Sequence, residues 1–482
     1  MEGLTTALNA VNDVLWSMPL VFLCLGAGIW FTVRMKFPQF RLIKDMFKLL
    51  SPGSKAADGI SPFQAFATTV GSRVGMGNIA GVATAIFFGG PGAVFWMWVI
   101  AIIGAASAFV ETALAQAYKI KTNDGEYLGG PQFFIEEALR AKPLAIAFAL
   151  ATILGPGILM PGVHINSIAS TFNQAFGLQE LLVGAVFCAV LALVICGGVK
   201  RIGTVAEYLA PVMCIVYVII GIVVIGMNIG QVPEALGLIF TSAFGASEMF
   251  AGIIGAAISW GVKRGVYSNE AGQGSGAIVS AAAETSHPAK QGLVQALSVY
   301  IDTLVISTVS ALIILLTGVY NVQGADGSMI VNNVPSLQYG ILWVQSALND
   351  AFTGTIGGKA LAIIIVMFVF TSLMGYYYEA ESNVRYLFKE NKVPLWIFRA
   401  IFILSCFTGV LVNGEVVWTM GDSGVALMAW INIVAILLLS NKSIAILKDY
   451  EEQKKAGKDP VFSPEKLGIK DETGAWAKYQ NQ

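Results

Sequence analysis

Residues 61–90 read SPFQAFATTVGSRVGMGNIAGVATAIFFGG, an apolar stretch that is rich in glycine at its centre. A helix of about 20 apolar residues crosses the hydrocarbon core of a bilayer, so this stretch is long enough to span it. Four glycines surround Asn78, namely Gly71, Gly75, Gly77 and Gly81. Because irregular backbone inside a membrane must face protein or a cavity, we predict an unwound segment at residues 74–78. Close helix packing through Gly77 and Gly81 is the alternative.

The composition of the whole chain excludes most soluble classes of protein and all disordered ones. Apolar residues make up 56% of its 482 residues, charged residues make up 12%, and the net charge is -1. That charge provides no basic surface for nucleic acid. The five cysteines lie singly in apolar runs, which predicts small buried side chains rather than disulfides or a zinc site. Residues 1–15 contain no Lys or Arg, so we expect no signal peptide there.

Eleven apolar stretches follow one another along the chain, and we predict an all-α polytopic membrane protein. The predicted spans are 16–35, 62–90, 92–118, 144–170, 180–198, 203–227, 246–267, 290–318, 358–384, 395–413 and 416–440. After residue 441 the sequence becomes polar and rich in lysine. This change predicts a solvated tail with helical character at its start.

Positive charge alternates between the connections of these spans. Lys and Arg occur at 34–55, 119–142, 200–201, 263–290 and 385–399 and from 442 onward, whereas the intervening connections contain neither, with Lys359 as the exception. Short cytoplasmic loops of membrane proteins carry the excess of positive charge. We therefore expect the N-terminus outside the cell and the C-terminus in the cytoplasm.

The seventh span repeats the glycine-rich pattern of the second. It reads SEMFAGIIGAAISWGVKRGVYSNEAGQGSG over residues 247–276, and we expect its break near Ile258 and Ser259. Five spans separate the two stretches, and an odd offset gives the two units opposite orientations in the membrane. We predict inverted repeats formed by spans 2–6 and 7–11, which correspond to residues 62–227 and 228–440. Residues 1–61 then hold an extra helix and a basic loop, and residues 441–482 form the tail.

An interrupted helix offers two kinds of electrostatic site. Its first half ends in carbonyl groups without helical partners, which favour a cation. Its second half begins with free amides, which favour a carboxylate. A zwitterionic amino acid bound beside a sodium ion would use both ends.

Two stretches resemble the signature motifs of the alanine or glycine:cation symporter family. They are GNIAGVATAIFFGGPGAVFWMWVIAIIG at residues 77–104 and SWGVKRGVYSNEAGQGS at residues 259–275. The resemblance covers nearly the whole chain. It implies a sodium-coupled importer of small neutral amino acids with the leucine-transporter-type fold, in a prokaryotic plasma membrane. It also implies sodium as the coupling ion, no organic cofactor and no enzymatic activity.

The segment VGMGN at residues 74–78 resembles the unwound first core helix of that fold. By this resemblance, sodium would be held by the carbonyls of Gly71, Val74 and Phe368 and the hydroxyls of Thr371 and Ser372. Back-bonding to a helix carbonyl is the alternative role for the two hydroxyls. The resemblance also implies that the amides of Met76 and Gly77 receive the substrate carboxylate, at the break that includes Gly75, and that Asn78 orients the substrate or a second ion. Met76 stands where family members often carry Thr or Ser.

Further substrate contacts are expected around the two predicted breaks. His164 lies in the motif MPGVHINS, where the family is expected to carry Gln, and it is either a substrate ligand or a packing residue. Ile258 and Ser259 are candidates to contact the substrate amine. Three aromatic residues are candidates to close the pocket, with ordinary packing as the alternative: Phe172, Phe176 and Trp260.

Charged residues inside spans are costly and therefore candidates for gating. Arg73 either locks an intracellular gate, substitutes for a second cation, or forms a structural salt bridge with Glu111 or another buried acid. Arg264 and Glu270, together with Lys263, are expected to form one cluster that closes the cytoplasmic exit, although a positive-inside loop also explains the two basic residues. The other acids in spans that we consider are Glu207, Asp302, Glu379 and Asp422.

The sequence motifs that other functions require are absent or remain open. No Walker motif is present, and the alternate glycines after residue 271 follow no strand, so nucleotide binding is not expected. Proton coupling through Glu111 or His164 stays open as an alternative to sodium. A channel or an intramembrane enzyme is less favoured, because neither pore-helix repeats nor Ser-His or HExxH pairs occur within the spans. The preferred amino acid and the oligomeric state are left open.

Overall fold

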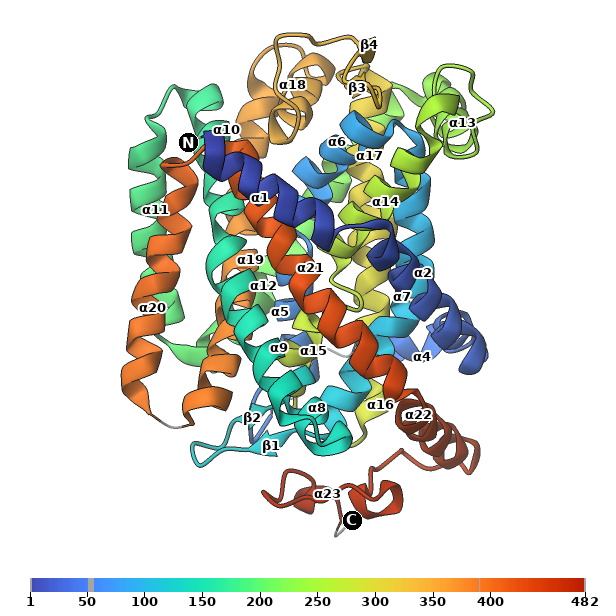
Figure 1. Ribbon diagram of the computed structural model, residues 1–482, viewed down its shortest axis with the longest axis vertical. Coiled ribbons are helices and arrows are strands. Elements are labelled where there is room, and N and C mark those ends of the chain that lie inside the picture. The colour runs from blue at the N-terminus through green and yellow to red at the C-terminus, as the bar shows by residue number, and fades with distance from the viewer. Residues whose placement is uncertain (1, 51–55, 390, 481–482) are drawn as a thin grey trace.

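The computed structural model describes residues 2–50, 56–389 and 391–480, and this part of the chain is predominantly helical (Figure 1). Its strands form two small antiparallel hairpins. One pairs β1 (Ile120–Lys121) with β2 (Tyr127–Leu128), and the other pairs β3 (Asn321–Gln323) with β4 (Met329–Asn332). The prediction of an all-α architecture is therefore confirmed in its main feature.

Eight helical segments of the described chain are long and apolar enough to cross a membrane. They are α1–α2 (Glu2–Leu15 and Met18–Arg34), α7 (Gly92–Ala117), α9–η1–α10 (Lys142–Leu154, Gly155–Leu159 and Pro161–Phe176), α12 (Gly198–Met227), α16–η4–α17 (Pro288–Val299, Tyr300–Ser307 and Thr308–Thr317), α19 (Ile356–Phe388), α20–η5 (Lys392–Phe407 and Thr408–Val410) and α21 (Gly414–Leu438). Each overlaps one predicted span.

The other three predicted spans correspond to shorter helices. The span at 180–198 is α11 (Glu180–Ile195). The glycine-rich span at 62–90 is divided into α5 (Pro62–Arg73) and α6 (Met76–Gly89). The seventh predicted span, 246–267, overlaps α14 (Ile254–Asn269), which is followed by α15 (Ser275–Ala281). Both interruptions are buried in the bundle, whereas the first turns of α14 reach its surface (Figure 1).

The break between α5 and α6 is narrower than the predicted one. α5 starts with a capping box between Ser61 and Gln64 and ends at Arg73, while Val74 and Gly75 leave the helical conformation. Helix resumes at Met76, so residues 76–78 form the first turn of α6 rather than an unwound segment. The reason is a cap, because the Asn78 side-chain oxygen accepts a hydrogen bond of 2.9 Å from the Gly75 amide.

The predicted position of the second break, near Ile258 and Ser259, is wrong. α14 is continuous through these residues, and the interruption falls at residues 270–274, where Glu270, Gly272 and Gly274 have positive φ angles of 57°, 85° and 90°. The earlier glycines have another role. A Cβ on Gly261 would lie 2.6 Å from the Ala93 carbonyl oxygen, so this glycine allows α14 to pack closely against α7.

The prediction that the cysteines are buried is confirmed for three of the five. Cys24, Cys188 and Cys406 are buried, whereas Cys214 is half-buried and Cys196 is exposed. Cys196 follows the last residue of α11, at the end of an outer helix, so it has fewer neighbours than the apolar sequence around it suggested.

The remaining elements lie at the two ends of the bundle. η2 (Ile229–Gln231), α13 (Val232–Ala243), η3 (Ala251–Ile253), α18 (Ile341–Ala351) and the β3–β4 hairpin are at the end that holds the N-terminus (Figure 1). The opposite end carries α3 (Pro38–Arg41), α4 (Ile43–Lys48), the β1–β2 hairpin, α8 (Pro131–Leu139), α22 (Ser440–Lys455), η6 (Pro464–Leu467) and α23 (Ala477–Gln480).

The C-terminal segment is not the solvated tail that its polar composition predicts. Its apolar residues Phe462, Ile469 and Trp476 are buried, and the rings of Phe462 and Trp476 lie 4.8 Å apart. The ammonium group of Lys119 lies 4.6 Å from the Trp476 ring centre, and the amide of Phe462 donates to the carbonyl of Ser286 at 2.8 Å. A few well-spaced apolar residues therefore fix this segment to the loops at its end of the bundle.

We predict that Trp476→Ala releases this segment. Truncating a buried tryptophan costs about 3–5 kcal/mol, and Trp476 is only 1% exposed. Limited trypsin digestion followed by mass spectrometry should show much faster cleavage at Lys466 and Lys470, because cleavage follows the population of the detached form. Glu472→Ala, at a nearby exposed position, is the control and should be cleaved like the wild type. Equal cleavage of the two variants would show that Trp476 does not hold the segment.

Candidate functional site

The break between α5 and α6 lies deep inside the bundle. All residues from 65 to 87 are buried, and α10, α12, α14 and α19 pack against this pair of helices. Gly75 is extended, with φ of -151°, and a Cβ there would lie 2.3 Å from the Ser372 hydroxyl oxygen of α19. A side chain at position 75 would therefore displace the Ser372 hydroxyl from its place beside the break.

Backbone groups at the break present opposite partial charges. The Gly75 amide is used by the Asn78 side chain, and the Asn78 amide donates to the Gly75 carbonyl at 3.2 Å. The amides of Met76 and Gly77 remain at the start of α6, where a helix has no internal acceptors for them. They form the positive end of α6, while the last carbonyls of α5 form a negative end beside it.

Four of the five predicted sodium ligands lie together where α5 meets α19. The Ser372 hydroxyl donates to the Gly71 carbonyl at 3.1 Å, and the Thr371 hydroxyl lies 3.1 Å from the Phe368 carbonyl. Thr371 also donates to the Met367 carbonyl at 2.9 Å, so the back-bonding alternative is present as well. The set consists of neutral oxygen donors, which fit a hard monovalent cation. The carbonyl of Val74, the fifth residue, belongs to the break itself.

His164 lies beside the break. Its Nε2 atom is 3.4 Å from the place a Cβ on Gly75 would occupy, and its ring meets Tyr376 edge-on with centroids 5.1 Å apart. α10 brings it there after a π-helical turn at Gly155–Leu159. Its Nδ1 lies 3.4 Å from the Met160 carbonyl, which leaves Nε2 as the atom that faces the break.

The other predicted substrate contacts lie elsewhere. Ala257 of α14 contacts Gly89, which lies at the far end of α6, about 18 Å along the helix from Gly77. The next residues of α14, which are Ile258, Ser259 and Trp260, are therefore also far from the break. The Trp260 ring stacks on Phe88 at that end, with centroids 4.4 Å apart. These positions follow from the continuous α14, because the actual break comes eleven residues after Ser259.

Phe172 and Phe176 are also remote from the break. Phe172 is two helical turns beyond His164, about 12 Å along α10, and lines an apolar pocket of about 350 Å³ with residues of α11 and α19. Phe176 is 42% exposed, and its ring lies 5.4 Å from that of Phe172. Both residues belong to the outer face of α10.

The residues of α14 beside the break are Tyr267 and Ser268. A Cβ on Gly77 would lie 2.9 Å from the Ser268 Cα atom and 3.2 Å from the Tyr267 ring. Neither residue was among the predicted contacts, although the motif YSNEAGQG, with its charged residue and two glycines, is a signal for a break just after them.

Asp302 joins the two interrupted helices. Its carboxylate accepts hydrogen bonds from the Asn78 side chain at 2.7 Å, the Ser268 hydroxyl at 2.9 Å and the Thr303 hydroxyl at 2.7 Å. It lies in the π-helical turn η4 of the described chain. The sequence identified Asp302 only as one acid among several in spans, and it gave no sign that this residue fixes the orientation of Asn78.

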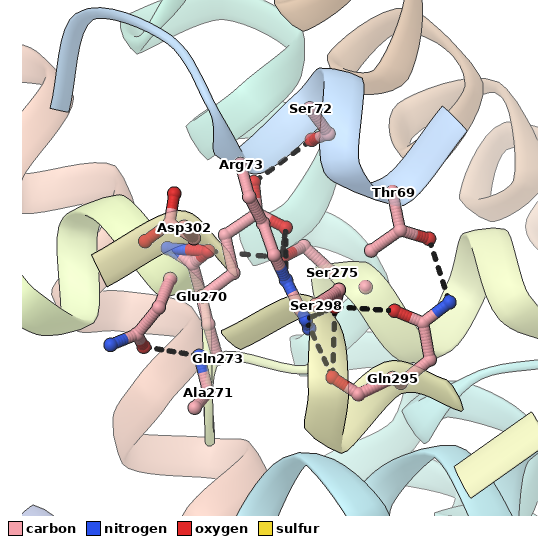
Figure 2. A network of polar contacts seen from close by, with 12 residues as sticks. Thr69, Ser72, Arg73, Glu270, Ala271, Gln273, Ser275, Gln295, Ser298 and Asp302 are labelled. Carbon is pink, nitrogen blue, oxygen red and sulfur yellow. Dashed lines mark hydrogen bonds and ion pairs between the residues drawn. The ribbon is translucent and has the colours of Figure 1, made fainter. Parts of the chain in front are cut away.

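Arg73 pairs with a buried acid other than Glu111 (Figure 2). Its Nε atom lies 3.9 Å from a Glu270 carboxylate oxygen, and its Nη1 donates to the Gln295 carbonyl at 3.2 Å and to the Ser298 hydroxyl. Glu111 instead accepts from the Asn432 side chain at 2.8 Å. Arg73 thus connects the end of α5 to the α14–α15 break and to α16.

The expected single cluster of Lys263, Arg264 and Glu270 does not form. Arg264 makes two hydrogen bonds of 2.8 Å to the carboxylate of Asp422, and Lys263 lies 2.8 Å from the same group. The Arg264 guanidinium also stacks over Trp418 at 4.8 Å. Arg264 approaches α6 at Gly81, in the half of the bundle that carries α13 and α18, whereas Glu270 faces Arg73 at the break.

The chain resembles known proteins along most of its length. A sequence profile of the sodium:alanine symporter family matches residues 1–464. YrbD of Bacillus subtilis (strain 168) is 48% identical over 463 residues, which cover 96% of this chain and 95% of that protein. The sodium/proton-dependent alanine carrier protein of Bacillus sp. (strain PS3) is 45% identical over 428 residues, which cover 88% of this chain and 96% of that protein.

The fold is also found among solved structures. The crystal structure of MhsT in complex with L-phenylalanine matches 82% of this chain and 99% of that chain, with a TM-score of 0.52 and 16% identity. This likeness shows the fold, which is the leucine-transporter type expected from the sequence motifs. The match of the profile and the identity to the two relatives show the family. The chain therefore belongs to the sodium:alanine symporter family and is an integral membrane transporter, not an enzyme.

Proposed function

We propose that this chain is a symporter that imports small neutral amino acids, alanine and glycine among them, together with sodium by alternating access. The observation that carries the proposal is the break at Val74–Gly75, where the carbonyl end of α5 meets the Thr371 and Ser372 hydroxyls and the amide end of α6 begins. A zwitterion and a cation need these two kinds of group side by side.

Sodium would be held by five neutral oxygens, the carbonyls of Gly71, Val74 and Phe368 and the hydroxyls of Thr371 and Ser372. The 3.1 Å hydrogen bond between the Ser372 hydroxyl and the Gly71 carbonyl supports this assignment, because it brings the two oxygens together. When sodium binds, the hydroxyl would turn its hydrogen away and both oxygens would face the cation. An uncharged ligand set leaves the positive charge available to a substrate carboxylate nearby, so the two solutes would stabilise each other's binding.

The amino-acid site would lie beside the sodium. The amides of Met76 and Gly77 would bind the carboxylate, and neutral His164 would donate a hydrogen bond from Nε2 when that atom carries the proton. Gly75 and Gly77 touch Ser372 and Ser268, so the space around the break is tight and favours a small side chain. The relative from strain PS3 is named an alanine carrier, which supports alanine as a substrate.

Two ion pairs are suited to gate this site from opposite sides. The Arg73–Glu270 pair ties α5 to the α14–α15 break, and the Arg264–Asp422 pair ties α14 to α21 in the half of the bundle that holds α13 and α18. Opening either side would separate one pair while the other stays closed. Glu111, which binds Asn432 of α21 near Gly272, belongs to the first side.

The proposed architecture has eleven spans, with residues 62–227 and 228–440 as inverted repeats. Breaks at the second and seventh spans support it, and so does the contact between Gly77 and Ser268, which places the two breaks against each other. The proposed orientation puts the N-terminus outside and the C-terminus in the cytoplasm of a prokaryotic cell. The oligomeric state is not part of the proposal.

One sodium ion per substrate provides enough energy for accumulation. A tenfold sodium gradient is worth about 1.4 kcal/mol, and a membrane potential of 100 mV adds about 2.3 kcal/mol. Together they support roughly 500-fold accumulation of a neutral amino acid. Proton coupling through Glu111 or His164 is the second candidate function, since the name of the relative from strain PS3 includes both ions.

The function is tested by uptake of labelled alanine into proteoliposomes. We expect an inward sodium gradient to drive uptake, and excess unlabelled alanine or glycine to compete strongly. Serine and glutamine in the same panel define the size limit of the site. A matched potassium gradient is the control for membrane potential. Uptake driven by a pH gradient alone, without sodium, would instead favour the proton-coupled alternative.

Thr371→Ala and Ser372→Ala should weaken sodium activation. Loss of one of five ligands is expected to raise the sodium concentration for half-maximal uptake about tenfold, equivalent to about 1.4 kcal/mol. Thr317→Ala is the matched control, because its hydroxyl also donates to a carbonyl four residues earlier, that of Ile313 at 2.8 Å, but lies in α17. If all three variants respond to sodium like the wild type, the assigned ion site is wrong.

Orientation can be measured by cysteine labelling in intact cells. In a Cys196→Ser background, a membrane-impermeant maleimide should label Asp326→Cys, in the β3–β4 turn, without permeabilisation. It should label Lys458→Cys only after the membrane is opened. Both positions are exposed, so access to the residue does not limit either reaction. The reverse pattern would place the N-terminus in the cytoplasm.

A further inference from the structure

A hydroxyl shared by two carboxyl groups lies next to the break, and the transport site described above does not use it. The Ser72 hydroxyl oxygen is 2.9 Å from a Glu270 oxygen and 2.9 Å from a Glu379 oxygen. All three residues are almost completely buried, with 1%, 0% and 0% of their surfaces exposed. Figure 2 shows Ser72 on α5 joined by a dashed line to Glu270, which follows the last residue of α14.

Counting hydrogens shows that this arrangement is one proton short if both acids are ionised. A serine hydroxyl has a single hydrogen, so it can donate to only one of the two carboxylates. The other carboxylate oxygen would then face the serine lone pairs at 2.9 Å, which is hydrogen-bond distance without a hydrogen. One of the two acids must therefore carry a proton and donate it to Ser72.

The surroundings indicate which acid carries it. Glu270 lies 3.9 Å from the Arg73 Nε atom and accepts a second hydroxyl bond of 2.9 Å from Ser275, so its negative charge is stabilised. Glu379 has only the Ser72 contact, and its second oxygen has no hydrogen-bond partner among the described residues. An ionised carboxylate in that position would be buried without compensation.

We propose that Glu379 is a proton-binding site of this transporter. In the form described here, in which α5 lies against α19 and which we call closed, the Glu379 carboxyl O–H donates to Ser72, and the Ser72 O–H donates to ionised Glu270. The proton leaves Glu379 for water when α5 moves away from α19 and the shared hydroxyl is withdrawn. The ligand of this site is a proton, and the site goes beyond the proposed sodium and amino-acid sites.

The position of Glu379 links this proton to the rest of the site. Ser72 lies between two proposed sodium-ligand residues, Gly71 of α5 and Val74 of the break, and Glu379 follows Ser372 by about two turns of α19. A Cβ on Gly375 would lie 2.6 Å from Ser72, so α5 and α19 touch along this whole stretch. Any separation of the two helices would break the Ser72–Glu379 bond.

Other charged and titratable groups surround the pair. They are Arg73 on α5, Glu111 on α7, His164 on α10, Tyr267 on α14, Asp302 in η4, and Tyr376 on α19 itself. Glu381, also on α19, faces Arg399 of α20 at 3.7 Å instead. Arg73 is the basic group that faces Glu270 and Glu379, and it lies against Glu270. Its charge therefore balances Glu270 and leaves Glu379 to be neutralised by a proton.

Infrared spectroscopy of the purified full-length protein tests the site without transport. The difference between wild type and Glu379→Gln should contain the carbonyl-stretch band of a protonated carboxyl group, and the band should shift in heavy water. Glu381→Gln is the matched control, since it removes a buried acid from the same helix away from Ser72, and its difference spectrum should lack this band. Ser72→Ala keeps Glu379 but removes its acceptor, so the band should move to higher frequency.

Either of two results would overturn the proposal: a Glu379→Gln difference spectrum without a carboxylic-acid band, or a Ser72→Ala spectrum in which the band does not move. The first would be the result if a metal cation, rather than a proton, occupied the pair. Failure of alanine uptake with the band present would contradict the proposed transport function and leave the proton site intact.

Transport provides a second readout of the same site. A proton that binds the closed form changes its population by up to about tenfold per pH unit. Since the closed form holds the proton, raising the pH on both sides should disfavour it and slow sodium-driven uptake. The ratio of uptake at low and high pH should approach one in Glu379→Gln, whatever its absolute rate, and stay at the wild-type value in Glu381→Gln. An unchanged ratio in Glu379→Gln would show that this proton has no part in transport.

Discussion

Peptide groups that lose their helical hydrogen bonds inside a membrane protein need other partners, and this requirement organises the centre of the molecule. Each unsatisfied buried group costs about 1–3 kcal/mol, and no water is available in the bilayer core. At Val74–Gly75 part of the demand is met internally, because Asn78 takes the Gly75 amide. The remaining amides and carbonyls have no helical partners, and these are the groups that the proposed binding site would use.

Around the break, small residues and buried polar side chains act together. Gly75 and Gly77 let α19 and α14 approach the backbone of the interruption, and Asp302 then holds Asn78 and Ser268 in place. The result is a rigid frame for the free carbonyls and amides. Rigid presentation matters because dipoles that are already oriented lose little on binding an ion.

The charged residues inside the bundle are arranged in separate groups rather than one network. Arg264, Lys263 and Asp422 form one group, and Arg73, Glu270 and Glu379 form another at the break. The first has more positive than negative groups, and the second has more acids than bases. A buried excess of acid is tolerated when a proton or a bound cation balances it. The second group lies at the break, where α5, α19 and the α14–α15 connection meet.

The sequence by itself determined the features that depend on composition along the chain. Apolar length identified the eight helical segments of the described chain that are long and apolar enough to cross a membrane, and the density of glycine around Asn78 identified a real break, because both properties are local. Tertiary structure decided everything that depends on which residues meet. The glycines at 261 and 265 look like those at 71–77, yet they allow α14 to pack against α7, and the second break falls at 270–274. Likewise, Phe172 was chosen for its chemistry but lines a pocket with α11 and α19 away from the break, Arg73 pairs with Glu270 rather than Glu111, and a polar tail is fixed by Trp476. Glycine spacing and charge do not specify a partner, since the partner lies on another helix whose rotation and height are set by packing.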